Sequence, residues 1–249
     1  MTPPTTVLAL EFRGVRETAD FGFLTAGARR TGVTRVDPLQ DHVSGRLALT
    51  DQAQRLVDTL TAPPRLVLGY CASAGLAARI AHLAGAALIL VDPDPVSADY
   101  VRQEADILCR ALGVVPGGAA IPPTYGELAG FESLLLTSRD AQADVYGGDA
   151  EAYEMVDDLL GRYRAWLRFL DASAHRAPVT IEGAVTIVCG KPLPPLTGLL
   201  TNPESAHVHH VGSKGGTLDL PEVRTLLSDM VSARPAHQGP INEGLTDAE

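Results

Sequence analysis

The amino-terminal third of the chain alternates short apolar segments with segments of helical periodicity, and this alternation restricts the fold more than any other feature. The apolar segments are continuous runs, as in strands buried on both faces of a parallel sheet. Apolar runs occupy residues 7–12, 33–36, 65–69 and 87–91, and helical segments occupy 17–30, 50–60 and 74–83. Strands and helices in this order form a parallel sheet with right-handed crossovers. We therefore predict an α/β fold with helices on both faces of the sheet.

The alternation stops after residue 92, and the next segments are helical. Ser97 and Asp149 are placed to cap two amphipathic helices, which a Gly/Pro-rich stretch over 113–130 separates. Further strands are expected at 179–188 and 206–211, followed by a helix at 221–230. We expect one domain over residues 1–231 with a helical insertion at about 93–177. The insertion forms a lid over the ligand face or simply covers the sheet, and the polar tail 232–249 is expected to be disordered.

Charge and cysteine content restrict the partners and the compartment. The net charge of −10 argues against nucleic acid or an anionic membrane as the main partner. The three cysteines, Cys71, Cys109 and Cys189, are widely spaced and fit neither a disulfide framework nor a metal motif. No apolar run reaches the ~18 residues of a membrane span, and the first residues do not resemble a secretory signal. We expect a cytoplasmic protein without a metal or dissociable cofactor.

The segment from Leu66 to Gly75 carries the most informative motif. It fits the nucleophile elbow, a tight strand-to-helix turn of the form small-x-nucleophile-x-small. Gly69 and Ser73 are the small residues on either side of Cys71. The helix that begins behind the turn offers free N–H groups and the positive end of its dipole, which favour a thiolate and a developing oxyanion. The motif predicts that Cys71 is a nucleophile, and an alternative register would place Ser73 at the apex.

The residues around the elbow resemble the α/β-hydrolase thioesterases that release polyketides and nonribosomal peptides. In that family the elbow is followed by a helix with an Ala-aromatic-Glu-Leu-Ala pattern and then by a strand ending in Leu-Asp. Here Ala77-Ala78-Arg79-Ile80-Ala81 and Ile89-Leu90-Val91-Asp92 lie at matching distances only if Cys71 is the apex. The resemblance covers roughly residues 7–91 and, more weakly, the last two strands. It implies an α/β-hydrolase fold with a largely parallel sheet.

The resemblance also implies roles for residues near the elbow. Asp92 matches the acid that follows the next strand, although an Asp before Pro is also a common turn residue. The N–H of Ala72 is expected to bind the oxyanion, and Arg13 or Gly14 is expected to supply the second donor. Arg13 could instead bind a carboxylate or phosphate, or simply be solvated. Tyr70 and Ser73, beside the nucleophile, are expected to contact substrate.

The family's catalytic histidine is missing from its usual place. Its Gly-Asp-His turn corresponds here to Gly212-Ser213-Lys214-Gly215-Gly216, which places Lys214 where the histidine belongs. His209 and His210, on the preceding predicted strand, are the other candidates for moving the proton. They face opposite sides of that strand. They could equally be ordinary strand residues.

Two classes of function follow from the resemblance. The first is a thioesterase-like hydrolase, acyl transferase or cyclase that acts through Cys71 on a polyketide or peptide thioester bound to an acyl carrier protein. The second is a catalytically degenerate relative that binds the carrier or intermediate, and the missing histidine favours it. A non-hydrolytic reaction in the same site is a further alternative.

Overall fold

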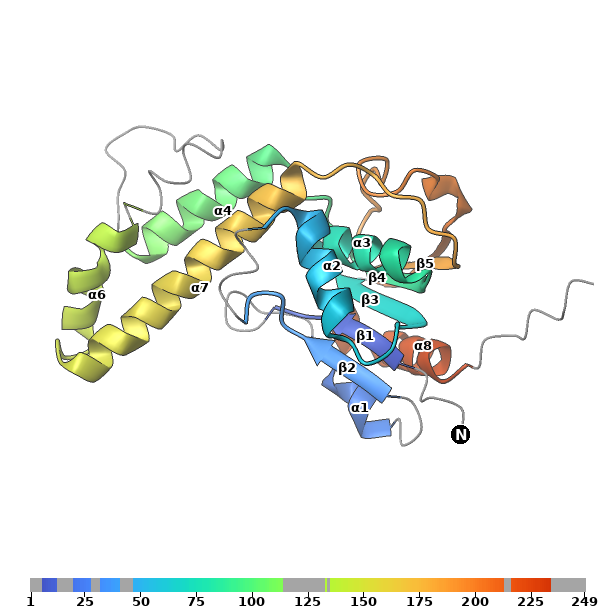
Figure 1. Cartoon of the computed structure of the whole chain (residues 1–249), viewed down its shortest axis with the longest axis horizontal. Helices are drawn as coiled ribbons and strands as arrows, with labels where there is room; N and C mark the ends of the chain where they lie inside the picture. Colours follow the sequence, from blue (N-terminus) through green and yellow to red (C-terminus); the bar gives the residue numbers. More distant parts are fainter. Residues whose placement is uncertain are drawn as a thin grey trace, which may run out of the picture.

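The computed structural model describes residues 6–12, 20–27, 32–40, 47–113, 133, 135–212 and 216–233. These residues form a six-stranded sheet of order β2-β1-β3-β4-β5-β6 in which every strand pair is parallel. The strands are β1 (Thr6–Leu10), β2 (Gly32–Val36), β3 (Leu66–Tyr70), β4 (Ala87–Val91), β5 (Val185–Cys189) and β6 (His207–His210). Figure 1 shows this sheet at the centre of the molecule. The predicted parallel α/β sheet is confirmed.

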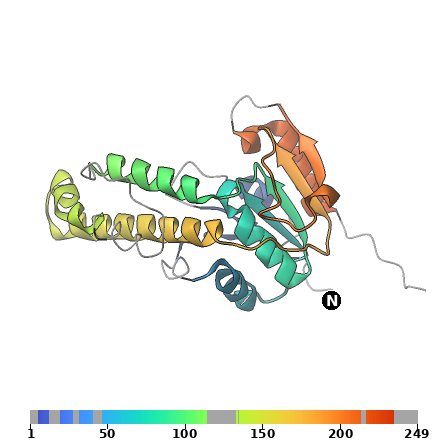
Figure 2. The ribbon, with the colours of Figure 1, turned by 90° about the horizontal axis from the view of Figure 1, so that it is seen from above.

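Helices cover both faces of the sheet. Helices α2 (Leu49–Thr59) and α3 (Ala74–Ala84) lie on one face, and α1 (Gly22–Gly27) and α8 (Pro221–Ser232) lie on the other (Figures 1 and 2). Successive strand residues point to opposite faces, so Leu88 and Leu90 pack toward α3, whereas Ile89 and Val91 pack toward α8. Both sets are buried, which is why these strands are continuous apolar runs in the sequence.

One predicted strand is shorter than expected. The sequence predicts a strand over 179–188, but β5 begins at Val185, and Val179 makes an isolated parallel bridge with Leu200. The chain bends at Gly183 between the two. A Cβ atom at Gly183 would lie 2.7 Å from the carbonyl oxygen of Ala86, so the bend depends on a glycine that approaches the neighbouring backbone closely.

The insertion after β4 is helical wherever the structure describes it. It contains α4 (Ala98–Ala111), α6 (Arg139–Val145) and α7 (Ala150–Ala174). The predicted caps are confirmed, because the side chain of Ser97 accepts from Tyr100 N–H and that of Asp149 accepts from Ala152 N–H. Figures 1 and 2 show α4 and α7 side by side in an arm that extends beyond the sheet, with α6 at its far end.

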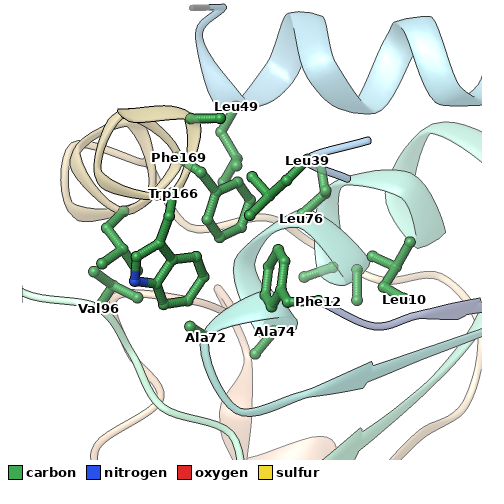
Figure 3. Close-up of a cluster of buried hydrophobic side chains, with 14 of the residues drawn as sticks. Leu10, Phe12, Leu39, Leu49, Ala72, Ala74, Leu76, Val96, Trp166 and Phe169 are labelled. Carbon is green, nitrogen blue, oxygen red and sulfur yellow. The ribbon is translucent and has the colours of Figure 1, made fainter. Parts of the chain in front are cut away.

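The inner end of this arm packs beside the β3–α3 turn. Phe12, which follows β1, contacts both Trp166 and Phe169 of α7, and its ring centroid is 4.9 Å from each of theirs. Figure 3 shows this cluster close to Ala72 and Ala74 at the start of α3. Edge-to-face aromatic contacts of this kind add to the stabilisation from burial. The insertion thus covers one side of the elbow, and its outer part lies away from the sheet. None of the helices that the structure describes is long and apolar enough to cross a bilayer.

The glycine before the turn gives a direct test of the packing there. A Cβ atom at Gly69 would lie 2.6 Å from the Cβ of Ala77, whereas one at Gly32 in edge strand β2 would meet nothing within 4 Å. We expect Gly69→Ala to lower the free energy of unfolding by about 1–3 kcal/mol through overpacking. The matched variant Gly32→Ala should leave it nearly unchanged. Urea denaturation measures both, and equal midpoints for the two variants would contradict this packing.

Candidate active site

Cys71 occupies the apex of a strained strand-to-helix turn. Its φ of +50° lies in the left-handed region, which residues with a side chain seldom adopt. A short 3₁₀ turn over Cys71–Ser73 leads directly into α3. This is the backbone of a nucleophile elbow, and it places Cys71 rather than Ser73 at the apex. Together with the parallel sheet and the helical insertion, it agrees with the α/β arrangement predicted from the sequence.

Ser73 closes the turn from inside. Its hydroxyl accepts from Tyr70 N–H at 2.8 Å and donates to Tyr70 carbonyl oxygen at 2.9 Å, and the residue is fully buried. The expectation that Ser73 contacts substrate therefore needs correction, because its only hydroxyl is engaged in holding the turn. Tyr70 is half-buried against the core under α8, and burial raises the pKa of its phenol.

The surroundings of the Cys71 thiol oppose its ionisation. Burial is the largest effect and, with the negative charge of Asp94, raises the pKa of the thiol to about 11. The N–H of Ala72, which hydrogen-bonds to the sulfur, and the charge of Lys191 act in the opposite direction, while Asp92 raises the pKa slightly further. The expected stabilisation of a thiolate by the helix terminus is therefore outweighed. Cys71 is a neutral thiol at pH 7.

Asp92 joins three segments at the carboxyl edge of the sheet. One carboxylate oxygen accepts from Gly190 N–H at 2.7 Å, and the other accepts from the hydroxyl of Thr217. These partners follow β5 and precede α8, so the carboxylate is directed away from β3. Gly190 is required here, because a Cβ atom would lie 2.2 Å from the Thr217 hydroxyl oxygen. Asp92 itself has a φ of +42°, a second strained position near the elbow. Asp92 thus has a structural role, and both carboxylate oxygens that a catalytic role would use already accept hydrogen bonds.

The strand order keeps the candidate histidines away from Cys71. Register pairs link Tyr70 to Val91, Val91 to Val188, and Val188 to His209. Three spacings between strands separate Tyr70 from His209, or about 14 Å between their Cα atoms. Side chains in one such row stand perpendicular to the sheet, so they do not reach along it.

The two histidines also differ in environment. His209 packs edge to face against His207, with ring centroids 4.5 Å apart, and its Nε2 is buried without a hydrogen-bond partner among the described residues. His210 pairs with Cys189 and is exposed. The structure does not bring either histidine to the elbow.

Two charged residues that sequence reasoning overlooked lie near Cys71. The N–H of Asp94 donates to Cys71 carbonyl oxygen at 3.2 Å. Lys191, which is exposed just after β5, acts electrostatically on both Cys71 and Asp94. Burial raises the pKa of the Asp94 carboxyl, and the positive charges of Lys191 and Arg176 oppose that rise. In the sequence, only the positions of these two residues could have pointed to the site. Both closely follow strands whose carboxyl ends form the ligand edge of a parallel sheet.

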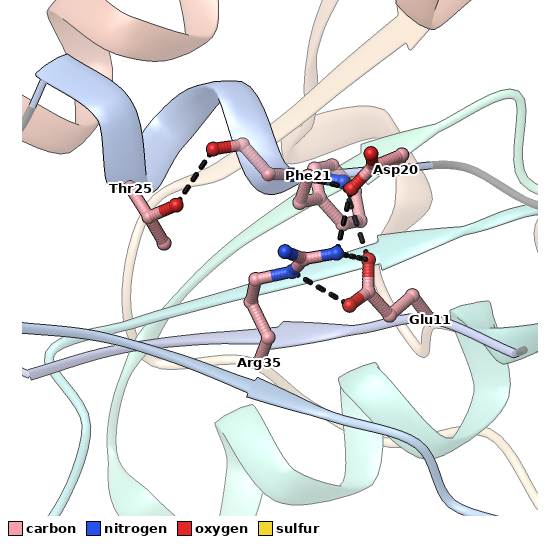
Figure 4. A network of polar contacts seen from close by, with 6 residues as sticks. Glu11, Asp20, Phe21, Thr25 and Arg35 are labelled. Atoms are coloured by element: carbon pink, nitrogen blue, oxygen red, sulfur yellow. Dashed lines mark hydrogen bonds and ion pairs between the residues drawn. The ribbon is translucent and has the colours of Figure 1, made fainter.

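Three predicted site residues, Arg13, Gly14 and Lys214, lie outside the described residues. The positions that flank the segment with Arg13 and Gly14 are nevertheless tied together, as Figure 4 shows. Glu11 is buried and accepts from Arg35 and from Phe21 N–H, while Arg35 also donates to Asp20. This network joins the end of β1 to the start of α1.

Other polar chemistry in the described part of the chain is limited. Within it, no cluster of three or more His, Cys, Asp or Glu side chains is arranged to hold a metal ion. Cys109 and Cys189 are buried free thiols, as expected of core residues.

Comparison with protein-family models and with curated proteins gives no match for this chain. Three solved structures resemble it across most of its length, each with a TM-score of 0.49. A putative α/β hydrolase family protein from Desulfitobacterium hafniense is 14% identical and covers 92% of this chain and 95% of its own. YbtT, a type II thioesterase from the yersiniabactin NRPS/PKS pathway, is 14% identical, with 93% of each chain covered. The Vlm2 thioesterase domain is 18% identical, with 91% and 94% covered. At this level of similarity no residue role transfers, so the function must be argued from this chain's own residues.

The raised pKa of Cys71 predicts an unusual pH dependence of alkylation. Below a pKa of about 11, the thiolate fraction and the rate of iodoacetamide labelling should rise about tenfold per pH unit from pH 7 to 10. Cys71 should still be labelled first, because Cys109 and Cys189 are only 0% and 2% exposed. Peptide mapping identifies the labelled site, and the chain in denaturant serves as the control, with an ordinary thiol midpoint at about pH 8.5. An alkylation midpoint of Cys71 in the folded protein as low as that in denaturant would refute this description. Labelling of Cys109 or Cys189 before Cys71 would also refute it.

The bond between Asp92 and Thr217 can be tested separately. We expect Thr217→Val to lower the free energy of unfolding by about 1–3 kcal/mol, since it removes a donor to a carboxylate while keeping the side-chain shape. Thr225→Val is the control, because the exposed Thr225 hydroxyl donates only to Pro221 carbonyl oxygen within α8. That change should stay within about 0.5 kcal/mol. Equal effects in chemical denaturation would show that Asp92 does not tie these segments together.

Proposed function

We propose that this protein is a thioesterase-like acyl-transfer enzyme, with Cys71 as the nucleophile and a polyketide or peptide thioester on an acyl carrier protein as the substrate. The observation that supports this most strongly is the left-handed backbone at Cys71, next to an Ala72 N–H that hydrogen-bonds to the sulfur. Such a turn presents one nucleophile beside a preformed backbone donor. The resemblance of the sequence to thioesterases supplies the substrate class.

The chemistry needs two transfers of the acyl group. In the first, Cys71 Sγ bonds to the thioester carbonyl carbon, the bond to the carrier sulfur breaks, and the carrier leaves as a thiol. Ala72 N–H stabilises the tetrahedral oxyanion, with Arg13 or Gly14 as the proposed second donor. In the second, water or a nucleophile within the acyl chain displaces Cys71, which gives hydrolysis or cyclisation. Because Cys71 is neutral at pH 7, the first transfer requires a base.

A non-catalytic binding protein is the second candidate. Both carboxylate oxygens of Asp92 have donors in the structure, and β6 holds His209 away from the elbow. An elbow that has kept its shape but lost its proton carrier could bind an acyl chain or its carrier without turnover. This candidate differs from the first in one respect that can be measured, the formation of a covalent bond to Cys71.

Intact-protein mass spectrometry after incubation with an acyl-N-acetylcysteamine thioester distinguishes the two candidates. We expect one acyl group on the wild-type chain and on Cys109→Ala, and none on Cys71→Ala. Cys109 is the matched control because it is a buried thiol on α4. Acylation that persists in Cys71→Ala would exclude Cys71 as the nucleophile. Absence of an adduct on the wild type, together with no release of free thiol from the thioester, would favour the binding protein.

A further inference from the structure

We propose that Asp94 is the proton carrier for Cys71, accepting the thiol proton during acylation and returning it to the leaving thiol. This proposal rests on the proposed acyl-transfer function and assigns the step for which the missing histidine left no residue. It is carried by the position of Asp94 against the elbow and by the absence, among the residues that the structure describes, of competing partners for its carboxyl group.

The backbone holds Asp94 firmly beside the nucleophile. Its N–H donates to Cys71 carbonyl oxygen at 3.2 Å, so the two residues are joined directly across the carboxyl ends of β3 and β4. Pro93 and Pro95 flank it, and Pro93 is buried. A proline has a fixed φ, and Pro95 also disfavours the α region for Asp94 before it. The segment is therefore stiff, which suits a group that must stay close to a reacting atom.

The carboxyl group of Asp94 is uncommitted, in contrast to that of Asp92. Asp92 binds Gly190 and Thr217 through its two oxygens. For the half-buried Asp94 carboxyl, the described part of the structure shows neither a hydrogen bond nor an ion pair. Of the two carboxylates, Asp94 also acts more strongly on the ionisation of Cys71. Asp94 is thus free to exchange a proton, whereas a proton on Asp92 would displace a donor.

The charges that face Asp94 suit this role. Burial raises the pKa of the Asp94 carboxyl, and the positive charges of Lys191 and Arg176 oppose that rise. A carboxyl group with a raised pKa is a better general base than an ordinary one. The described histidines outside β6 are engaged elsewhere: His82 Nδ1 lies 2.7 Å from Thr180 carbonyl oxygen, and His175 Nδ1 lies 2.9 Å from Asp171 carbonyl oxygen. Within the described residues, Asp94 is the best placed group for the proton.

The proton balance of the reaction is complete with this assignment. As Cys71 Sγ bonds to the acyl carbon, its proton passes to Asp94, directly or through one water molecule. The bond to the carrier sulfur then breaks, and Asp94 returns the proton to that sulfur. In the second half, Asp94 takes a proton from the incoming water or hydroxyl group and delivers it to Cys71 Sγ. No oxidant, metal or further reactant is consumed.

Asp94→Asn gives a test with two readouts that move in opposite directions. Loss of the negative charge should shift the alkylation midpoint of Cys71 to lower pH, so labelling at pH 7 becomes faster. Loss of the proton carrier should slow Cys71 acylation by a thioester at pH 7 by about 10²-fold or more. Asp99→Asn is the matched control, since Asp99 is exposed and pairs with Arg102 on α4. Asp94→Glu, which keeps a carboxyl group, should retain most of the acylation rate.

The possible outcomes separate this proposal from the proposed function. If the wild type forms no acyl adduct and releases no thiol from the thioester, the acyl-transfer function fails, and the role of Asp94 fails with it. If the wild type is acylated and Asp94→Asn is acylated as fast or faster, Asp94 only opposes the thiolate, and this proposal alone is overturned. Faster alkylation combined with slower acylation in Asp94→Asn, with Asp99→Asn unchanged in both, is the result that we expect.

Discussion

The left-handed backbone at Cys71 is the constraint on which the rest of the site depends. A residue with a side chain in this conformation costs on the order of 1–3 kcal/mol, and it persists only when its surroundings fix it. Gly69 lets β3 pack against Ala77, and Ser73 bonds to both backbone groups of Tyr70. The strained backbone at Cys71 therefore does not itself stabilise the fold. Its effect is to place one thiol beside one backbone N–H at the carboxyl edge of the sheet.

The carboxyl edge of the sheet is acidic near Cys71, and the two carboxylates there, those of Asp92 and Asp94, have different roles. Asp92 holds the ends of β4 and β5 to the segment before α8 through Gly190 and Thr217. Asp94 is hydrogen-bonded to the elbow through its backbone N–H, and its carboxyl group has no partner in the described part of the chain. A buried thiol between such groups remains protonated, unlike the thiolate of a cysteine paired with a cation. The site suits chemistry in which the proton leaves as the new bond forms.

The sequence predicted those features that depend only on residues close together in the chain. The spacing of Gly69, Cys71 and Ser73 lies within one turn, so the elbow could be recognised directly, and Ser97 and Asp149 cap their helices as predicted. Relations that depend on how distant segments meet could not be read in this way. The order of the strands in space separates His209 from the elbow.

The ionisation of Cys71 was not predictable for the same reason. A helix terminus is visible in a sequence and favours a thiolate, but the burial of the sulfur and its distance from Asp94 arise only when the chain has folded. Lys191 likewise reaches the site only because β5 pairs with β4. The register of the sheet thus decides which charges act on the thiol that the sequence predicts to be the nucleophile.

The most direct test of the central claim is a crystal structure of the protein after reaction with an acyl thioester. The account predicts an acyl carbon bonded to Cys71 Sγ, its carbonyl oxygen within hydrogen-bond distance of Ala72 N–H, and the left-handed turn retained. An acyl group on Cys109 or Cys189, or a bound thioester that leaves Cys71 unmodified, would contradict it.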